Sequence, residues 1–195
     1  MKLYEPKQFS FGEIPGISAQ QLAVHIALYE GYVKHINTLR EQIVALKAGA
    51  PAYVRDELRR RYAFEWNGAR LHEYYFEQLE GGATSLAESV VLLERVLEKF
   101  PSEEAFIEHV KEVAGTRGIG WVIGTYDKRE GAIHVLWVAD HEIGHLAGAP
   151  ILFAIDMWEH AFMIDYVPAE KKTYIDAVLS AMNWKVVEER LSHAG

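Results

Sequence analysis

Apolar positions recur at helical spacing through the first part of the chain. After an irregular N-terminal arm, Ser18 and Gln21 form a capping-box pattern, which predicts the start of a long helix over residues 19–47. A break at residues 48–51 separates this helix from a second long one, which is expected to end at Gly81. Two long helices with a short link between them predict an antiparallel hairpin.

The pattern remains helical as far as residue 118. A third helix is predicted over residues 85–100, and a fourth begins at Ser102, where two acidic residues in the first turn suit the helix dipole. The apolar stripe of the third helix is expected to contain Val90, Val91, Leu93 and Val96.

The pattern then changes to one typical of β-structure. Residues 121–126 and 132–138 are rich in β-formers, and the turn signal at residues 127–131 predicts a hairpin between them. Residues 150–155 predict a third strand. Helical spacing returns from residue 159 onward and over residues 171–191.

This order predicts an α+β fold. A long N-terminal antiparallel helical hairpin is followed by an α/β domain with a small, three-stranded antiparallel sheet. We place the N-terminal hairpin domain at residues 1–83 and the C-terminal α+β domain at residues 84–195.

Composition narrows the functions that are open to this chain. Its 195 residues carry a net charge of −8, which argues against sequence-independent nucleic-acid binding. No apolar run is long enough to span a membrane, and the N-terminus has no apolar segment typical of a secretory signal, so we expect a cytoplasmic protein. The absence of cysteine excludes disulfides and thiolate ligands, whereas nine histidines favour metal chemistry.

Four side chains are candidate metal ligands. His25 lies on the first predicted helix and His72 on the second, while Asp156 ends the third strand and His160 follows four residues later. Three imidazole nitrogens and a carboxylate oxygen suit a first-row metal that changes oxidation state. Either helical histidine taken alone is more typical of a hydrogen-bonded core residue.

Five segments together resemble the iron/manganese superoxide dismutase family. They are ISAQQLAVH (17–25), WNGARLHEYYF (66–76), GIGWVIG (118–124), DMWEHAFMIDY (156–166) and MNWKVVEERL (182–191). They occur in the order typical of the family and span nearly the whole chain, and DMWEHAFMIDY is the most specific of them.

The resemblance implies a superoxide dismutase that holds one iron or manganese ion per subunit. Its ligands would be His25, His72, Asp156 and His160. Tyr32, His141 and Trp121 would be the catalytic residues around the ion, with Trp158, Tyr75 and Phe76 helping to exclude water. The resemblance also implies a homodimer or a dimer of dimers, in which Glu159 of one subunit reaches His160 of another.

Several positions depart from the family pattern. The spacing between His25 and Tyr32 is one residue shorter than usual. Tyr29 and Met163 replace a histidine and a tyrosine that pair across the family's dimer, which suggests a rebuilt entrance to the site.

Further departures concern groups near the metal and the path of the substrate. Gly68 cannot supply the glutamine that many iron forms place beside the metal, but His141, in the segment ADHE, resembles the replacement found in some members. The family's substrate-guiding arginine is missing, and Lys171 or Lys172 are the candidates to replace it.

A competing motif remains. The segment HEIGH at residues 141–145 matches the zinc-protease pattern, in which two histidines one helical turn apart bind zinc and the glutamate is the general base. Gly144 within the motif and the preceding β-rich run disfavour the helix that this chemistry needs. The alternatives are therefore a zinc metallopeptidase or a catalytically altered, dismutase-like metal-binding protein.

Overall fold

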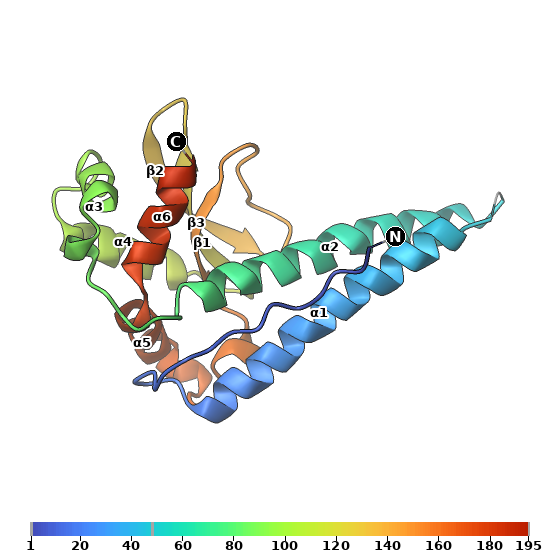
Figure 1. The fold of residues 1–195 in the computed structure, drawn as a ribbon, viewed down its shortest axis with the longest axis horizontal. Helices are drawn as coiled ribbons and strands as arrows, with labels where there is room; N and C mark the ends of the chain where they lie inside the picture. The colour runs from blue at the N-terminus through green and yellow to red at the C-terminus, as the bar shows by residue number, and fades with distance from the viewer. Residues whose placement is uncertain (1, 48, 195) are drawn as a thin grey trace.

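The computed structural model describes residues 2–47 and 49–194. Helices α1 (Ala19–Ala45) and α2 (Ala52–Glu77) form the antiparallel hairpin predicted from the sequence, and this hairpin projects from the rest of the molecule (Figure 1). The Ser18 hydroxyl accepts a hydrogen bond from the Gln21 backbone N–H at 3.0 Å and thus caps α1 as predicted. Helix α2 ends earlier than expected, at Glu77, and a turn leads on to Gly81.

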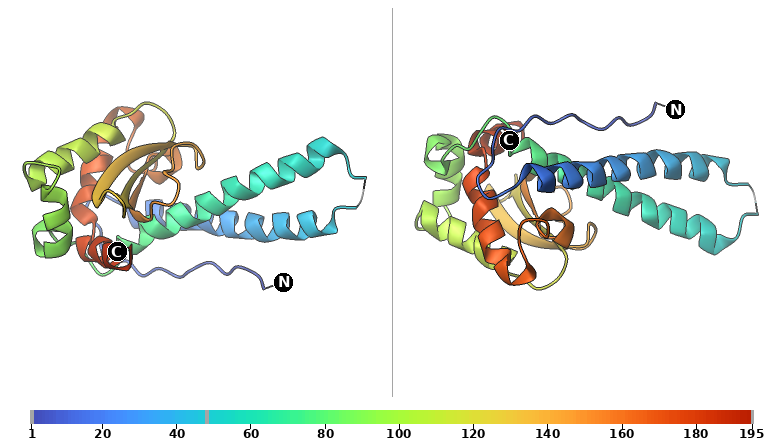
Figure 2. Two further views of the ribbon diagram at one scale, coloured as in Figure 1. Left: turned by 90° about the horizontal axis from the view of Figure 1, so that it is seen from above. Right: turned by 90° about the horizontal axis from the view of Figure 1, so that it is seen from below.

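The N-terminal arm runs in an extended conformation beside the hairpin, as the views in Figure 2 also show. Contacts with both helices hold it there. The Tyr4 ring packs edge-on against Trp66 of α2 at a centroid distance of 5.0 Å, and the Lys7 backbone N–H donates to the Tyr29 hydroxyl of α1 at 2.8 Å. The arm is therefore part of the packed structure of the hairpin.

The prediction of one helix over residues 85–100 is wrong. A 3₁₀ turn, η1 (Leu86–Glu88), is followed by helix α3 (Val90–Leu97), and non-helical backbone at the buried Ser89 separates them. The break changes which residues face inward, so Leu92 and Val96 are buried, whereas Val90 and Val91 of the expected stripe are 59% and 53% exposed. Helix α4 (Glu103–Ala114) begins at the predicted cap, because the Ser102 hydroxyl accepts from the Ala105 N–H.

The three predicted strands form one antiparallel sheet. Strands β1 (Gly120–Asp127), β2 (Ala132–Ala139) and β3 (Ile151–Asp156) are arranged in the order β2-β1-β3. Strand β1 is therefore central, and Trp121 on it pairs with Asp156 at the end of β3. The α+β fold class predicted from the sequence is confirmed.

The C-terminal region is less continuous than the sequence indicated. Instead of a helix from residue 159 onward, the chain forms two 3₁₀ turns, η2 (Glu159–Ala161) and η3 (Pro168–Glu170). The helix expected over residues 171–191 is divided into α5 (Lys171–Ala181) and α6 (Trp184–Ala194).

A hydrogen-bond anchor explains the division between α5 and α6. The Asn183 backbone N–H donates to the Gln78 carbonyl at 2.7 Å, and its side-chain amide donates to the Glu80 carbonyl at 3.0 Å. These bonds fasten the chain to the segment after α2, which prevents a straight helix through Asn183.

Gln78, just beyond α2, also joins the hairpin to the sheet. Its side-chain amide donates to the Ala154 carbonyl at 2.6 Å, and its side-chain oxygen accepts from the Ala154 N–H at 3.1 Å. Both bonds are buried and fix the C-terminal end of α2 against β3, two residues before Asp156. None of the described helices combines the length and apolar character required to cross a bilayer.

Candidate metal centre

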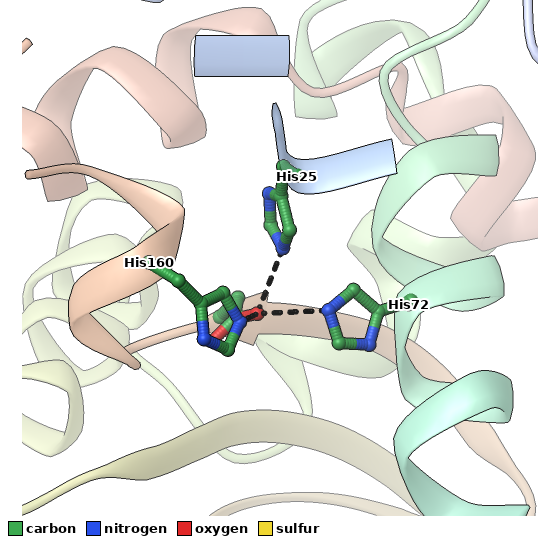
Figure 3. A group of neighbouring side chains, drawn as sticks. His25, His72 and His160 are labelled. Carbon is green, nitrogen blue, oxygen red and sulfur yellow. Dashed lines mark hydrogen bonds and ion pairs between the residues drawn. The ribbon is translucent and has the colours of Figure 1, made fainter. Parts of the chain in front are cut away.

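Three imidazoles converge on one carboxylate oxygen at the place where the hairpin meets the sheet. The Nε2 atoms of His25 (α1), His160 (η2) and His72 (α2) lie 3.0, 3.2 and 3.5 Å from Asp156 Oδ2 (Figure 3). One ligand atom from each of the four residues lies within 4.8 Å of all the others. The structure thus brings together all four residues that the sequence singled out as metal ligands.

His72 provides the test of whether a metal fits here. Its Nδ1–H donates to the Gly68 carbonyl at 2.6 Å, so the Nε2 atom carries the lone pair that faces Asp156. This Nε2 atom is fully buried and has no hydrogen-bond partner among the described residues. An unpaired buried nitrogen is costly unless something binds it, and a metal ion is the natural partner in a group of three imidazoles and a carboxylate.

The charge states of these groups also suit a metal. Burial lowers the pKa of His25 and lowers that of His72 well below its ordinary value, so both imidazoles remain neutral and able to coordinate. Burial opposes ionisation of Asp156, but its electrostatic interactions and hydrogen bonds with the His160 and His25 rings hold the pKa of Asp156 well below its usual range. The site therefore presents the neutral nitrogens of His25 and His72 and the ionised oxygen of Asp156.

Hydrogen bonds from the backbone and from a buried tyrosine orient Asp156. Its Oδ1 accepts from the Trp158 N–H at 2.8 Å, which turns Oδ2 toward the imidazoles. Its backbone carbonyl accepts from the Tyr174 hydroxyl at 2.8 Å. Such outer contacts fix the direction in which a ligand points.

Gln21 places His160 against α1. This buried side chain donates to the His160 carbonyl at 2.7 Å and accepts from the Ile164 N–H at 3.0 Å. It therefore ties the turn that carries His160 to the helix that carries His25. The sequence analysis used Gln21 only as part of a capping pattern and missed this role.

His141 and Tyr32 form a hydrogen-bonded pair beside the four ligands, which we call the gate pair. The Trp121 Nε1–H donates to His141 Nδ1 at 2.9 Å, so the neutral ring carries its proton on Nε2, which donates to the Tyr32 hydroxyl oxygen at 2.9 Å. The Tyr32 ring lies 5.2 Å from the His72 ring. The three residues expected to be catalytic are thus joined in one chain of bonds.

Gly68 creates the space that Tyr32 occupies. A Cβ atom on Gly68 would lie 2.7 and 2.8 Å from two carbons of the Tyr32 ring, closer than packed atoms approach. Tyr32 reaches His141 although its spacing from His25 is one residue shorter than usual in the family. The absence of a side chain at position 68 is what admits the ring.

Aromatic rings enclose the centre. Trp158 stacks on His141 at 5.0 Å and lies 5.6 Å from His160, while Tyr75 and Phe76 lie 5.1 and 4.9 Å from His25. These rings are where the sequence analysis expected them.

Phe64 was missed by the sequence analysis. Its ring lies 4.6 Å from that of His141. The spacing of Phe64, Gly68 and His72, four residues apart in turn, places all three along one side of α2, which could have indicated that Phe64 lines the site.

Tyr29 is buried where α1 meets α2 and the N-terminal arm. Its hydroxyl donates to Glu73 Oε1 at 3.0 Å and accepts from the Lys7 N–H, which joins α1 to α2 and to the N-terminal arm. Met163, the other changed member of the expected pair, is exposed. Tyr29 therefore holds the arm in place.

The HEIGH segment does not have the geometry of a zinc protease. Residues 141–145 form a turn after β2 and no helix. His141 Nε2 is bonded to Tyr32, and His145 Nε2 bonds to the His141 carbonyl at 3.0 Å, so the two rings do not present lone pairs to a shared ion. The structure gives no support to the metallopeptidase alternative.

The chain's sequence matches a known family over more than half of its length. Residues 88–190 match the model for the C-terminal domain of iron/manganese superoxide dismutases. The chain belongs to this family. It is 31% identical to an iron superoxide dismutase of Cupriavidus metallidurans over 98% of both chains.

Two further relatives have names that specify different metals. A manganese, mitochondrial superoxide dismutase of Glossina morsitans morsitans is 30% identical over 95% of this chain and 87% of the relative. An iron superoxide dismutase of Aquifex aeolicus is 31% identical over 93% of this chain and 87% of the relative. Family membership confirms the resemblance seen in the sequence, and it agrees with the His and Asp cluster of Figure 3.

Proposed function

We propose that this protein is a superoxide dismutase, which converts superoxide to dioxygen and hydrogen peroxide at a single iron or manganese ion. The ion is bound by His25, His72, Asp156 and His160. The convergence of three imidazole nitrogens on Asp156 Oδ2, with the buried His72 Nε2 left unpaired, is the observation that carries this proposal. Family membership supports the same chemistry.

An iron or manganese ion held by the four residues would supply the one-electron redox chemistry that superoxide dismutation needs. The superoxide that is reduced also needs two protons to leave as hydrogen peroxide. His141 donates its Nε2–H to the Tyr32 oxygen, so the Tyr32 O–H proton points elsewhere and is available to a small molecule in the site. Burial raises the pKa of Tyr32 well above its ordinary value, which keeps this proton on the hydroxyl at neutral pH.

Trp121 sets the direction of this proton donor. Because its Nε1–H occupies His141 Nδ1, the neutral His141 ring has its remaining proton on the side of Tyr32. Burial lowers the pKa of His141 to about 4, so the ring stays neutral in the cell's pH range. The surrounding Trp158, Tyr75 and Phe76 rings exclude bulk water and larger reductants.

The proposed assembly is a homodimer or a dimer of dimers. Glu159 is exposed beside His160 in the same turn, where its carboxylate can accept a hydrogen bond from His160 of a partner subunit. Each subunit then supplies an outer contact to the other's metal ligand, as a symmetric interface requires. The proposal extends to two domains, residues 1–83 and 84–195, that meet at the metal.

An antioxidant role in the cytoplasm, without nucleic-acid or membrane partners, completes the proposal. The net charge of −8 supports the absence of a nucleic-acid partner.

Metal content and superoxide decay, measured on the same preparation, test the function. We expect about one iron or manganese ion per subunit and rapid superoxide decay that disappears when the metal is removed. Bound metal with no effect on superoxide decay would favour a dismutase-like metal-binding protein instead. Loss of metal in a His145→Ala variant would revive the zinc-protease alternative. Elemental analysis of protein from its native host identifies the ion.

A further inference from the structure

A cationic side chain covers the outer side of the gate pair. Phe64 packs on His141 at 4.6 Å and on Tyr32 at 6.4 Å, and the Arg61 guanidinium carbon lies 3.8 Å from the Phe64 ring centroid. From solvent inward, the Arg61 guanidinium therefore comes first, then the Phe64 ring, and then the gate pair. The Arg61 side chain is 43% exposed, whereas His141 is buried.

An ion pair fixes the direction of Arg61. Its Nε donates to Glu65 Oε1 at 2.7 Å, and Glu65, only 3% exposed, also lies 3.3 Å from His35 Nδ1 through its other oxygen. The carboxylate is thus the inner end of the pair and the guanidinium the outer end. Within residues 2–47 and 49–194, no hydrogen bond uses the two terminal nitrogens of Arg61, so they can meet an anion.

The charge of Arg61 reaches both members of the gate pair. Burial is the main influence on each pKa, and the Asp156 charge raises both, as does the Glu65 charge for Tyr32; the positive charge of Arg61 lowers the pKa of Tyr32 and of His141. The neighbouring cation, Arg60, is offset by Glu57 at 2.7 Å and Glu142 at 3.8 Å.

The lysines expected to guide substrate do not replace Arg61. The Lys171 ammonium donates to the Thr116 carbonyl at 3.0 Å and lies 5.5 Å from the centroid of the Trp137 ring. The charges that influence the pKa of Tyr32 come from Asp156, Glu65 and Arg61. A chain with a net charge of −8 nevertheless needs a local cation to attract an anionic substrate.

We infer that Arg61 guides the superoxide anion to the gate pair, in the role that the sequence analysis gave to Lys171 or Lys172. This inference rests on the proposed dismutase function. Arg61 acts before the chemical step, by raising the concentration of the anion at the entrance, so its effect belongs to kcat/KM and depends on salt.

A matched pair of arginine variants tests the inference. Arg61→Gln is compared with Arg95→Gln, because Arg95 is equally exposed at 43% and also pairs with a nearby glutamate, Glu98, three residues later in the chain. At low salt we expect kcat/KM to fall by up to about tenfold in Arg61→Gln and to stay unchanged in Arg95→Gln. The difference should shrink as salt rises from about 0.01 M to about 1 M, where the Debye length falls from about 30 Å to about 3 Å. Arg61→Lys keeps the charge and should keep most of the rate.

Azide binding provides a readout independent of turnover. As a small anion that enters from solvent, azide should bind the metal-loaded Arg61→Gln variant more slowly than wild type in stopped-flow absorption, and Arg95→Gln at the wild-type rate. If Arg61→Gln alone fails to fold, the double variant Arg61→Gln/Glu65→Gln removes both charges and leaves no unpaired buried carboxylate.

The outcomes separate this inference from the proposed function. Equal kcat/KM and equal salt dependence in Arg61→Gln and Arg95→Gln, with an active wild type, would overturn the role of Arg61. A loss of rate that high salt leaves unchanged would mean a structural role and would overturn it as well. Metal-loaded wild-type protein with no dismutase activity would instead overturn the proposed function.

Discussion

The Tyr32 ring occupies the volume that a side chain at Gly68 would need. Two ring carbons lie 2.7 and 2.8 Å from the position of a Cβ atom there, although both residues belong to long, regular helices. Glycine in a helix costs roughly 0.5–1 kcal/mol relative to alanine. In return, the glycine leaves room for the Tyr32 ring to reach His141.

Gly68→Ala should therefore displace Tyr32 and reduce activity. Overpacking costs about 1–3 kcal/mol, which the better helix propensity of alanine only partly offsets. Gly31→Ala is the matched control, because a Cβ at this helical glycine meets nothing within 4 Å and should stabilise the protein by roughly 0.5–1 kcal/mol. Urea unfolding and superoxide decay measure both effects. Full activity in Gly68→Ala would show that the position of Tyr32 does not depend on the glycine.

Removal of one ligand should abolish most metal binding. His160→Ala leaves two imidazoles and Asp156, and losing a direct ligand should cost more than the about 10–100-fold that outer contacts are worth. His134→Ala is the control, since His134 belongs to a second group of possible ligands, with Asp127 and Glu130, at the β1–β2 hairpin. Metal analysis after dialysis should show loss in His160→Ala only. Loss of metal in His134→Ala instead would place the ion at the hairpin.

The sequence singled out the four residues that converge in the structure because each belongs to a local pattern. His25 and His72 lie on strongly periodic helices, and Asp156 and His160 lie together in one short, distinctive segment. Their meeting required only that the hairpin pack against the end of β3. Gln78, which makes that contact through two hydrogen bonds to Ala154, carries no local signal, since a glutamine near a helix end is usually exposed.

The errors arose where distant contacts decide local structure. Residues 171–191 have continuous helical periodicity, but hydrogen bonds from Asn183 to the segment after α2 break the helix there. The stripe that included Val90 and Val91 assumed an unbroken helix from residue 85, and the non-helical backbone at Ser89 changed its phase. Periodicity alone contains no information on either break.

Glu159→Ala should weaken the dimer and the activity together. The proposed hydrogen bond from a partner's His160 to the Glu159 carboxylate is charge-assisted and worth roughly 1.5–3 kcal/mol, and a symmetric interface contains two of them. The dimer dissociation constant should therefore rise by at least about 100-fold. Glu112→Ala, at an exposed position on α4, should leave sedimentation and rate unchanged. An unchanged dimer in Glu159→Ala would exclude the bond between subunits.

The low pKa of His141 predicts a specific loss of stability in acid. Burial lowers the pKa of this imidazole to about 4 in the folded protein from 6.5. Between about pH 4 and pH 6.5, the unfolded chain therefore binds a proton at His141 that the folded protein does not bind. The contribution of His141 to the free energy of unfolding is fully present above about pH 6.5 and is lost as the pH falls toward 4. The whole loss amounts to about 3 kcal/mol.

His141→Gln isolates this contribution. The glutamine amide can still donate to Tyr32 and accept from Trp121, but it has no proton to gain in this range. The free energy of unfolding of wild type minus that of the variant should therefore be smaller at pH 4.5 than at pH 7. The other buried histidines contribute equally to both proteins, so they cancel in this difference. Urea unfolding of both proteins in matched metal-loaded preparations at the two pH values measures it. A difference that is the same at both pH values would mean that folding does not shift the pKa of His141, and it would contradict the prediction.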